Sequence, residues 1–204
     1  MKRIKNSVFA VFVAVFVVGT APVHATQTGA SATVLEFQNA LIELMKKADS
    51  LSVSQRYDLL EPAVTNAFHI RLMSQIATGM YWAEATHTEQ QNLTKAFKRM
   101  SVSTLATLFD GYSGEYFRHI GEKPGPQKTQ LVITEIVKSD KSTVNISYIT
   151  RNFKEGWKII DVIVDAGISE LKVRRSEYHQ ILKTSGITSL IQVLNNKADQ
   201  LISQ

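Results

Sequence analysis

Two carboxylates, Asp161 and Asp165, are the side chains of this sequence with the clearest potential for acid–base chemistry. They lie in residues 157–169, WKIIDVIVDAGIS, where polar and apolar residues follow the period of an extended strand. On such a strand they share a face about 13 Å apart, because each residue advances the chain by about 3.3 Å. Glycosidases need their paired carboxyl groups about 5 to 10 Å apart. The spacing therefore argues against a glycosidase, and Asp165 better fits a turn or a helix cap.

Ser113 lies in residues 111–114, GYSG, which invite comparison with the nucleophile elbow of serine hydrolases. That motif requires a glycine two residues after the serine, where this chain has Glu115. It also requires a strand before the serine, whereas the preceding residues have helical spacing. We therefore interpret the segment as a turn that ends a helix.

The sequence offers no obvious metal site. The histidines beyond the amino-terminal segment are His69, His87, His119 and His179. None of them forms an HxxxH or HExxH pair. The chain has no cysteine, which excludes thiol catalysis and disulfide bonds. We expect no cofactor, no metal ion and no catalytic residue.

Residues 1–25 have the features of a secretory signal peptide. Lys2, Arg3 and Lys5 precede an apolar run over residues 8–18, and residues 23–25, VHA, provide small side chains for cleavage. The run is shorter than the roughly 20 apolar residues of a membrane-spanning helix. We therefore expect cleavage after residue 25, export from the cytoplasm and a single domain over residues 26–204.

The formal net charge of +5 partly reflects the basic residues of this signal. Elsewhere Lys and Arg are scattered, and only Lys172, Arg174 and Arg175 cluster. A nucleic-acid-binding protein normally has a clustered basic excess, so we expect no nucleic-acid partner. The cluster fits an ordinary solvated helix face, with a docking patch as the alternative.

The elements that must position any site divide into helices and strands. Helical spacing covers residues 34–48, 54–60, 70–80, 89–109, 169–183 and 188–202, with a break at Gly186. Ser54 is a candidate cap, and Thr88 with Gln91 has the spacing of a capping box. Extended spacing covers 131–137, 144–149 and 157–164, with a short strand at 116–120, a loop at 121–126 and turns at 139–141 and 154–156. This order predicts an α+β fold with helices packed on a curved antiparallel sheet.

The strand over 157–164 is apolar on both of its expected faces. Alternation places Trp157 and Ile159 on one face, and Val162 and Val164 on the other. An antiparallel strand with one face in water should be polar at every second position. We therefore expect this strand to be covered on both sides, by helices and by either more helix or a pocket for an apolar ligand.

Two motifs resemble a known family. Residues 109–117, FDGYSGEYF, follow the helix that begins near residue 88. Later come 157–162, WKIIDV, and 167–169, GIS, and then Arg175, Tyr178 and Gly186 followed by leucines at 190 and 194. In order and spacing they resemble the MlaC family of periplasmic phospholipid-binding proteins, also called the toluene-tolerance auxiliary component. The form DGYSGE is similar to the hopanoid-biosynthesis-associated, HpnM-like branch.

This resemblance implies an NTF2-like curved antiparallel sheet with helices that enclose an apolar cavity. It implies a soluble, monomeric lipid carrier that holds the acyl chains of a phospholipid, or a hopanoid-type lipid, with the headgroup in water. The implied partners are an outer-membrane lipoprotein–porin complex and an inner-membrane ABC transporter with an MCE-domain subunit. The implied role is to shuttle lipid between the two membranes and so maintain the lipid asymmetry of the outer membrane.

Aromatic and branched residues near the turn and the sheet are the candidate lipid contacts. We expect the cavity or its mouth to be formed by Phe109, Tyr112, Tyr116, Phe117, Trp157, Ile159, Val162, Val164 and Ile168. Which parity of the strand faces inward stays open at this point, and so does the alternative that these residues form an ordinary filled core.

Two other functions are compatible with the sequence. NTF2-like cavities also house enzymes, and an enzyme acting on an isoprenoid or hopanoid lipid would need a polar pair in the pocket, for which Asp161 with Tyr148 is the candidate. A protein adaptor without lipid would instead use the face of residues 172–175.

Overall fold

The computed structural model describes residues 29–165 and 167–204, and the predicted signal peptide lies outside these residues. The α-helices are α1 Ala30–Met45, α2 Val53–Ala67, α3 Ile70–Thr78, α4 Met80–Glu84, α5 His87–Leu108 and α6 Glu170–Ile202. The short 3-10 helices are η1 Ala48–Ser50 and η2 Pro126–Lys128. The strands are β1 Tyr116–Pro124, β2 Thr129–Val137, β3 Thr143–Phe153, β4 Gly156–Val164 and β5 Ile168–Ser169.

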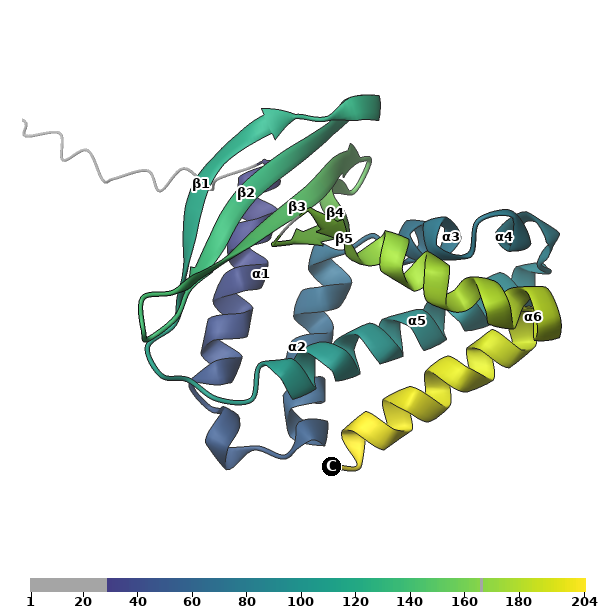
Figure 1. Cartoon of the computed structure of the whole chain (residues 1–204), viewed down its shortest axis with the longest axis horizontal. Helices are drawn as coiled ribbons and strands as arrows, with labels where there is room; N and C mark the ends of the chain where they lie inside the picture. The colour runs from purple at the N-terminus through teal and green to yellow at the C-terminus, as the bar shows by residue number, and fades with distance from the viewer. Residues whose placement is uncertain (1–28, 166) are drawn as a thin grey trace, which may run out of the picture.

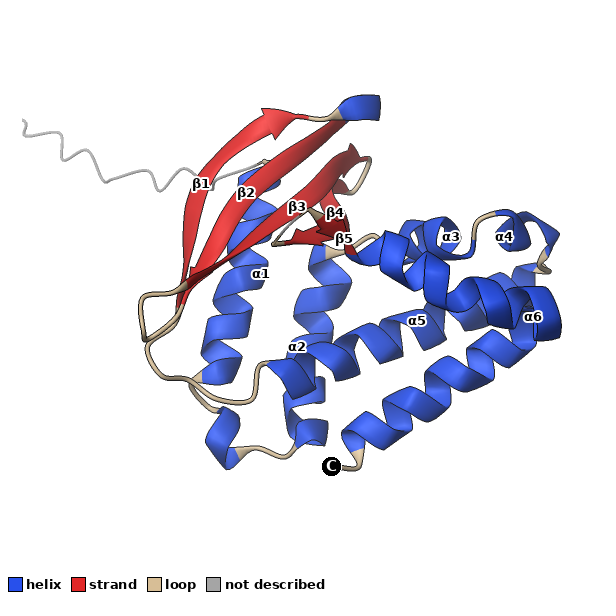
Figure 2. Ribbon diagram, in the orientation of Figure 1, coloured by secondary structure: helices blue, strands red, loops and turns tan. Residues whose placement is uncertain are grey.

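The strands form one antiparallel sheet in chain order, β1-β2-β3-β4-β5. The predicted turns at 139–141 and 154–156 lie where β2 meets β3 and where β3 meets β4. Figure 2 shows the curved sheet, in red, beside the helices, in blue. The predicted α+β class with helices on a curved antiparallel sheet is confirmed.

The helices gather on one side of the sheet (Figure 1). Gln38 of α1 is buried and donates from Nε2 to Thr134 Oγ1 at 3.0 Å and to Tyr148 Oη at 3.3 Å, which marks this side as the inner face. On the outer face, Ile163 of β4 is only half-buried. Ile160 of the same strand is only 6% exposed, so the expectation that β4 is covered on both sides stays a prediction.

A β-bulge interrupts the alternation of β4. Tyr148 and Thr150, two residues apart on β3, pair with Val162 and Ile159, which are three residues apart on β4. One extra residue on β4 therefore lies between these pairs. Cross-strand partners share a face. Ile159 thus lies on the inner face together with Val162, and the strict alternation that separates them in the sequence-based prediction is wrong.

The capping box of α5 lies two residues earlier than predicted. Thr86 Oγ1 accepts a hydrogen bond from the Glu89 N–H at 3.2 Å, and Glu89 Oε2 accepts one from the Thr86 N–H at 2.9 Å. The sequence contains overlapping boxes, Thr86 with Glu89 and Thr88 with Gln91. The box that forms places an ionised carboxylate in the first turn, where the helix dipole favours negative charge.

The start of α2 also differs from the prediction. Ser52, not Ser54, caps the helix through a reciprocal pair of hydrogen bonds with Gln55. The helix then continues through Pro62 to Ala67 instead of ending near the proline.

Two glycines mark the remaining irregularities. β1 is longer than the predicted 116–120 strand, because Gly121 continues it through a register shift. The predicted loop at 121–126 is therefore wrong over residues 121–124. The predicted break at Gly186 is confirmed: its φ of 75° and ψ of −176° interrupt α6. Figure 1 shows the yellow second half of α6 folded back from the green first half. Both α3 and α5 pack against α6.

Candidate functional site

An apolar cavity of about 290 Å³ lies between the inner face of the sheet and the helices. The sheet lines it with Ile146, Tyr148, Val162 and Val164, and α1 lines it with Phe37 and Leu41. Phe68, just before α3, and Met73 of α3 complete this side. From α5 and its end it is lined by Phe97, Ser101, Thr104, Leu105, Leu108 and Phe109, and from α6 by Glu170, Leu171 and Arg174. The lining is predominantly hydrocarbon, so the cavity suits an apolar ligand.

The period of each element explains why these side chains converge. On β3 and β4, Ile146 pairs with Val164 and Tyr148 with Val162, so all four share the inner face. On α5, Phe97 and Leu105 lie two turns apart and therefore on one side of the helix. This side of α5 faces the cavity.

The cavity contains one buried polar group, the Tyr148 hydroxyl. It accepts a hydrogen bond from Gln38 Nε2, and burial raises the pKa of Tyr148 to about 12. The phenol is therefore neutral at physiological pH. Gln38 Oε1 is buried without a hydrogen-bond partner among the described residues.

The charged residues of the lining, Glu170 and Arg174, both belong to the first turns of α6. The Arg174 side chain is 22% exposed, and its Nη1 lies 3.8 Å from Glu177 Oε2. Ser169 caps this helix by accepting from the Lys172 N–H, and its hydroxyl donates to Asp161 Oδ2 at 2.6 Å. This contact with the sheet therefore positions Glu170 and Arg174 at the edge of the apolar cavity.

The structure brings together part of the predicted site. Phe109, Val162 and Val164 line the cavity. Ile159 is fully buried in the adjoining core, and Phe117 packs against that core from β1. That any of them contacts a ligand stays a prediction.

The remaining candidates lie elsewhere. Tyr112, Tyr116 and Ile168 are 39%, 46% and 55% exposed. Tyr112 lies in the loop before β1, with Lys46 Nζ at 5.8 Å from the centre of its ring. Tyr116 pairs with Val137, which places it on the outer face of the sheet. These three do not line the cavity.

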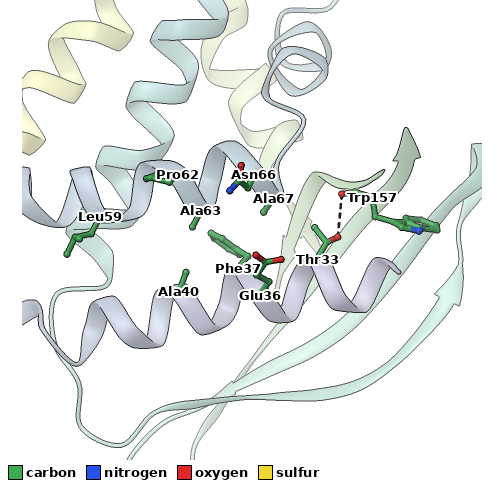
Figure 3. Close-up of a pocket in the computed structure, with 10 residues that line it drawn as sticks. All are labelled: Thr33, Glu36, Phe37, Ala40, Leu59, Pro62, Ala63, Asn66, Ala67 and Trp157. Carbon is green, nitrogen blue, oxygen red and sulfur yellow. Dashed lines mark hydrogen bonds between the residues drawn. The ribbon is translucent and has the colours of Figure 1, made fainter. Parts of the chain in front are cut away.

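A second hollow, of about 340 Å³, lies between α1 and α2, and Trp157 of β4 lines one end of it (Figure 3). Thr33, Glu36, Phe37 and Ala40 line it from α1, and Leu59, Pro62, Ala63, Asn66 and Ala67 from α2. The Thr33 hydroxyl donates to the Trp157 carbonyl at 3.4 Å. Several of its lining residues are exposed, so it is a surface groove. The first cavity also opens to solvent, where Leu108 is 67% exposed, but its lining is more apolar.

Sequence reasoning missed Phe37, Leu41, Ile146, Glu170 and Arg174 as cavity residues. Phe37 and Leu41 had a readable signal, since they are four residues apart on one face of an amphipathic helix. No sequence signal predicts that Arg174 lies at the cavity, because a basic residue on a helix is normally expected to face solvent.

The pair proposed for an enzyme, Asp161 with Tyr148, does not form. Asp161 pairs with Ile149, the neighbour of Tyr148 on β3, so the two side chains lie on opposite faces of the sheet. The Asp161 carboxylate instead accepts from the Leu171 N–H at 3.1 Å and from the Ser169 hydroxyl. It holds the start of α6 in place.

Residues 29–165 and 167–204 show neither a metal site nor a membrane-spanning helix. In that part of the chain, no group of three or more His, Asp or Glu residues could hold a metal ion. Within the same residues, none of the helices has the length and apolar character needed to cross a bilayer.

Comparison with known proteins supplies the family. A solved structure with the same fold is that of the phospholipid-binding protein from Ralstonia solanacearum, in complex with a phospholipid. The two chains are 19% identical, and the match has a TM-score of 0.75 and covers 85% of this chain and 99% of that chain. The profile of the MlaC protein family matches residues 35–196. Because this match spans most of the sequence, the chain belongs to the MlaC family.

Proposed function

We propose that this protein is a periplasmic lipid carrier that encloses an acyl chain of a phospholipid in the cavity between the sheet and α5. The observation that carries the proposal is an apolar cavity with a charged edge, in a chain of the MlaC family. The phospholipid bound to the Ralstonia solanacearum protein supports the same ligand class.

The size of the cavity sets how much lipid it holds. At about 30 Å³ per group, the volume of a water molecule in the liquid, about 290 Å³ accommodates about ten methylene groups. Their transfer from water is worth about 8 kcal/mol, at about 0.8 kcal/mol per methylene. This free energy is enough for binding. The number of methylene groups corresponds to one acyl chain and not to two. Further hydrocarbon requires either that α5 and α6 move away from the sheet or that a second site exists.

The charges at the cavity edge select the headgroup. Arg174 is suited to a phosphate, because a guanidinium forms charge-assisted hydrogen bonds with phosphate oxygens. Glu170, one turn earlier on the same face, is suited to the cationic part of a zwitterionic headgroup. This arrangement favours a phospholipid over a hopanoid-type lipid with an uncharged headgroup.

We propose that the carrier acts as a monomer and shuttles lipid between an outer-membrane lipoprotein–porin complex and an inner-membrane MCE-domain ABC transporter. Residues 1–25 would direct export, and residues 26–204 would form the single lipid-binding domain. A carrier needs no catalytic pair, and the opposite orientations of Asp161 and Tyr148 disfavour the enzyme alternative.

Lipid extraction tests the proposal. The full sequence is expressed in a Gram-negative host, and the protein is purified from the periplasmic extract without detergent. Mass spectrometry of the organic extract should find phospholipid at close to one molecule per chain, and the intact mass should correspond to a chain that begins at Thr26. Protein free of lipid that also fails to take up phospholipid from vesicles would overturn the proposal.

A further inference from the structure

His69 lies at the junction of α2 and α3 and caps the start of α3. Its Nδ1 accepts a hydrogen bond from the Leu72 N–H at 3.1 Å. Because Nδ1 is the acceptor, the neutral imidazole carries its proton on Nε2. A second proton can therefore bind only to Nδ1, the atom that caps the helix. The ring packs against Phe153, with ring centres 4.3 Å apart, and the side chain is 24% exposed, so it remains accessible to water.

The same junction joins the helices to the sheet and forms part of the cavity wall. The His69 N–H donates to the Ile159 carbonyl at 2.9 Å, and Phe68 pairs with Ile159 in an isolated β-bridge. Phe68 and Met73, which lies in the first turn of α3, both line the cavity. The cap on α3 therefore stabilises the turn of the chain that places these two side chains in the wall.

Charged groups on the surrounding elements do not replace the cap when His69 is protonated. Glu155, in the turn between β3 and β4, has Oε1 at 3.9 Å from Nε2, and its side chain is 58% exposed, so water weakens the attraction. Lys154 in the same turn and Lys158 on β4 are positive, and Lys158 donates to a backbone carbonyl near the end of α2. Arg71 of α3 is also positive and reaches a side chain of α5. The helix dipole disfavours a further positive charge at the start of α3.

We propose that His69 is a pH-sensitive switch in the cavity wall, and that its protonation loosens the start of α3 and weakens lipid binding. The added proton makes Nδ1 a donor that faces the Leu72 N–H, so the cap is lost and Phe68 and Met73 are held less firmly. An imidazole gains its second proton as the pH falls from about 7.5 to about 5.5. Lipid affinity is therefore highest at neutral and higher pH and falls in mild acid. The inference rests on the proposed function, because it describes the regulation of the same lipid site.

Binding of a pyrene-labelled phosphatidylcholine at pH 7.5 and at pH 5.5 tests the switch, because this headgroup keeps its charge over that range. We expect the affinity of the unaltered protein to fall about fivefold, the effect of losing one helix cap. His69→Asn retains a capping side chain that does not titrate, so its affinity should change by less than about twofold. His87→Asn removes an exposed histidine at the start of α5 and should retain the fall of about fivefold.

An equal fall in the unaltered and His69→Asn proteins, or no fall in the unaltered protein, would overturn the switch and leave the proposed function intact. Failure of the unaltered protein to bind phosphatidylcholine at pH 7.5 would contradict the proposed function itself.

Hydrogen exchange of the unaltered, lipid-free protein tests the switch without a variant that must fold. Protection of the Leu72 and Met73 amides, corrected for the intrinsic effect of pH on exchange, should fall about fivefold between pH 7.5 and pH 5.5. The Phe97 amide, in the middle of α5, should keep its protection. Equal protection of Leu72 and Met73 at the two pH values would contradict the proposal.

Discussion

Replacement of Val162 by phenylalanine should weaken lipid binding without lowering the stability of the fold. Val162 lies on the inner face of β4 and contributes to the wall of the cavity. The phenyl ring adds about four carbon atoms in a space that holds about ten methylene groups, so it displaces about four methylenes of a bound chain. At about 0.8 kcal/mol each, the loss is about 3 kcal/mol, or roughly a hundredfold in the dissociation constant. The lipid-free protein should be as stable as the original chain or more so, because a filled cavity gains contacts.

The assay combines thermal unfolding of the lipid-free protein with equilibrium binding of a fluorescent phospholipid. Ile163→Phe is the matched control, since it adds a ring to the adjacent position on the outer face of the same strand. We expect the control to bind lipid as the original chain does. Equal affinities of the Val162→Phe and Ile163→Phe proteins would refute the assignment of this cavity to the acyl chain.

Three further predictions concern the edge of the cavity, a helix start and a buried phenol. Arg174→Ala should lower the affinity for phospholipid by about tenfold relative to an uncharged diacylglycerol, as expected for one charge-assisted hydrogen bond, whereas Lys172→Ala should not change this ratio in competition binding. Thr86→Ala should lower the free energy of unfolding by about 1 kcal/mol, and Thr88→Ala by much less, in chemical denaturation. Because burial raises the pKa of Tyr148 from 10.0 to about 12, folding favours its protonated form; the resulting stability is complete below pH 10 and is lost as the pH rises towards 12. Tyr148→Phe should flatten the fall in melting temperature over that range, and an unchanged slope would contradict this assignment.

The sequence predicts the elements well, because their periods are local properties. The period of two in 131–137 and 144–149 marks β2 and β3, and Gly186 marks the break in α6. It predicts exact starts less well. Thr86 and Thr88 both have the spacing of a capping box, and only the folded chain shows which box forms.

The cavity depends on features that local patterns do not contain. The bulge in β4 becomes visible only from its register with β3, and it decides that Ile159 shares a face with Val162. The position of Arg174 depends on the contact of Asp161 with Ser169, which holds the start of α6 at the edge of the sheet. Phe37 has the pattern of an ordinary core residue, and only the packing of α1 against α2 shows that it separates two hollows.

Nuclear Overhauser effects between a bound phospholipid and the methyl groups of the protein would test the central claim most directly. With methyl-labelled protein and unlabelled lipid, we expect the chain methylenes to give contacts to Ile146, Val162 and Val164 on the inner face of the sheet. Contacts only to Ile149 and Ile163 on the outer face, in a protein that has bound lipid, would contradict the account.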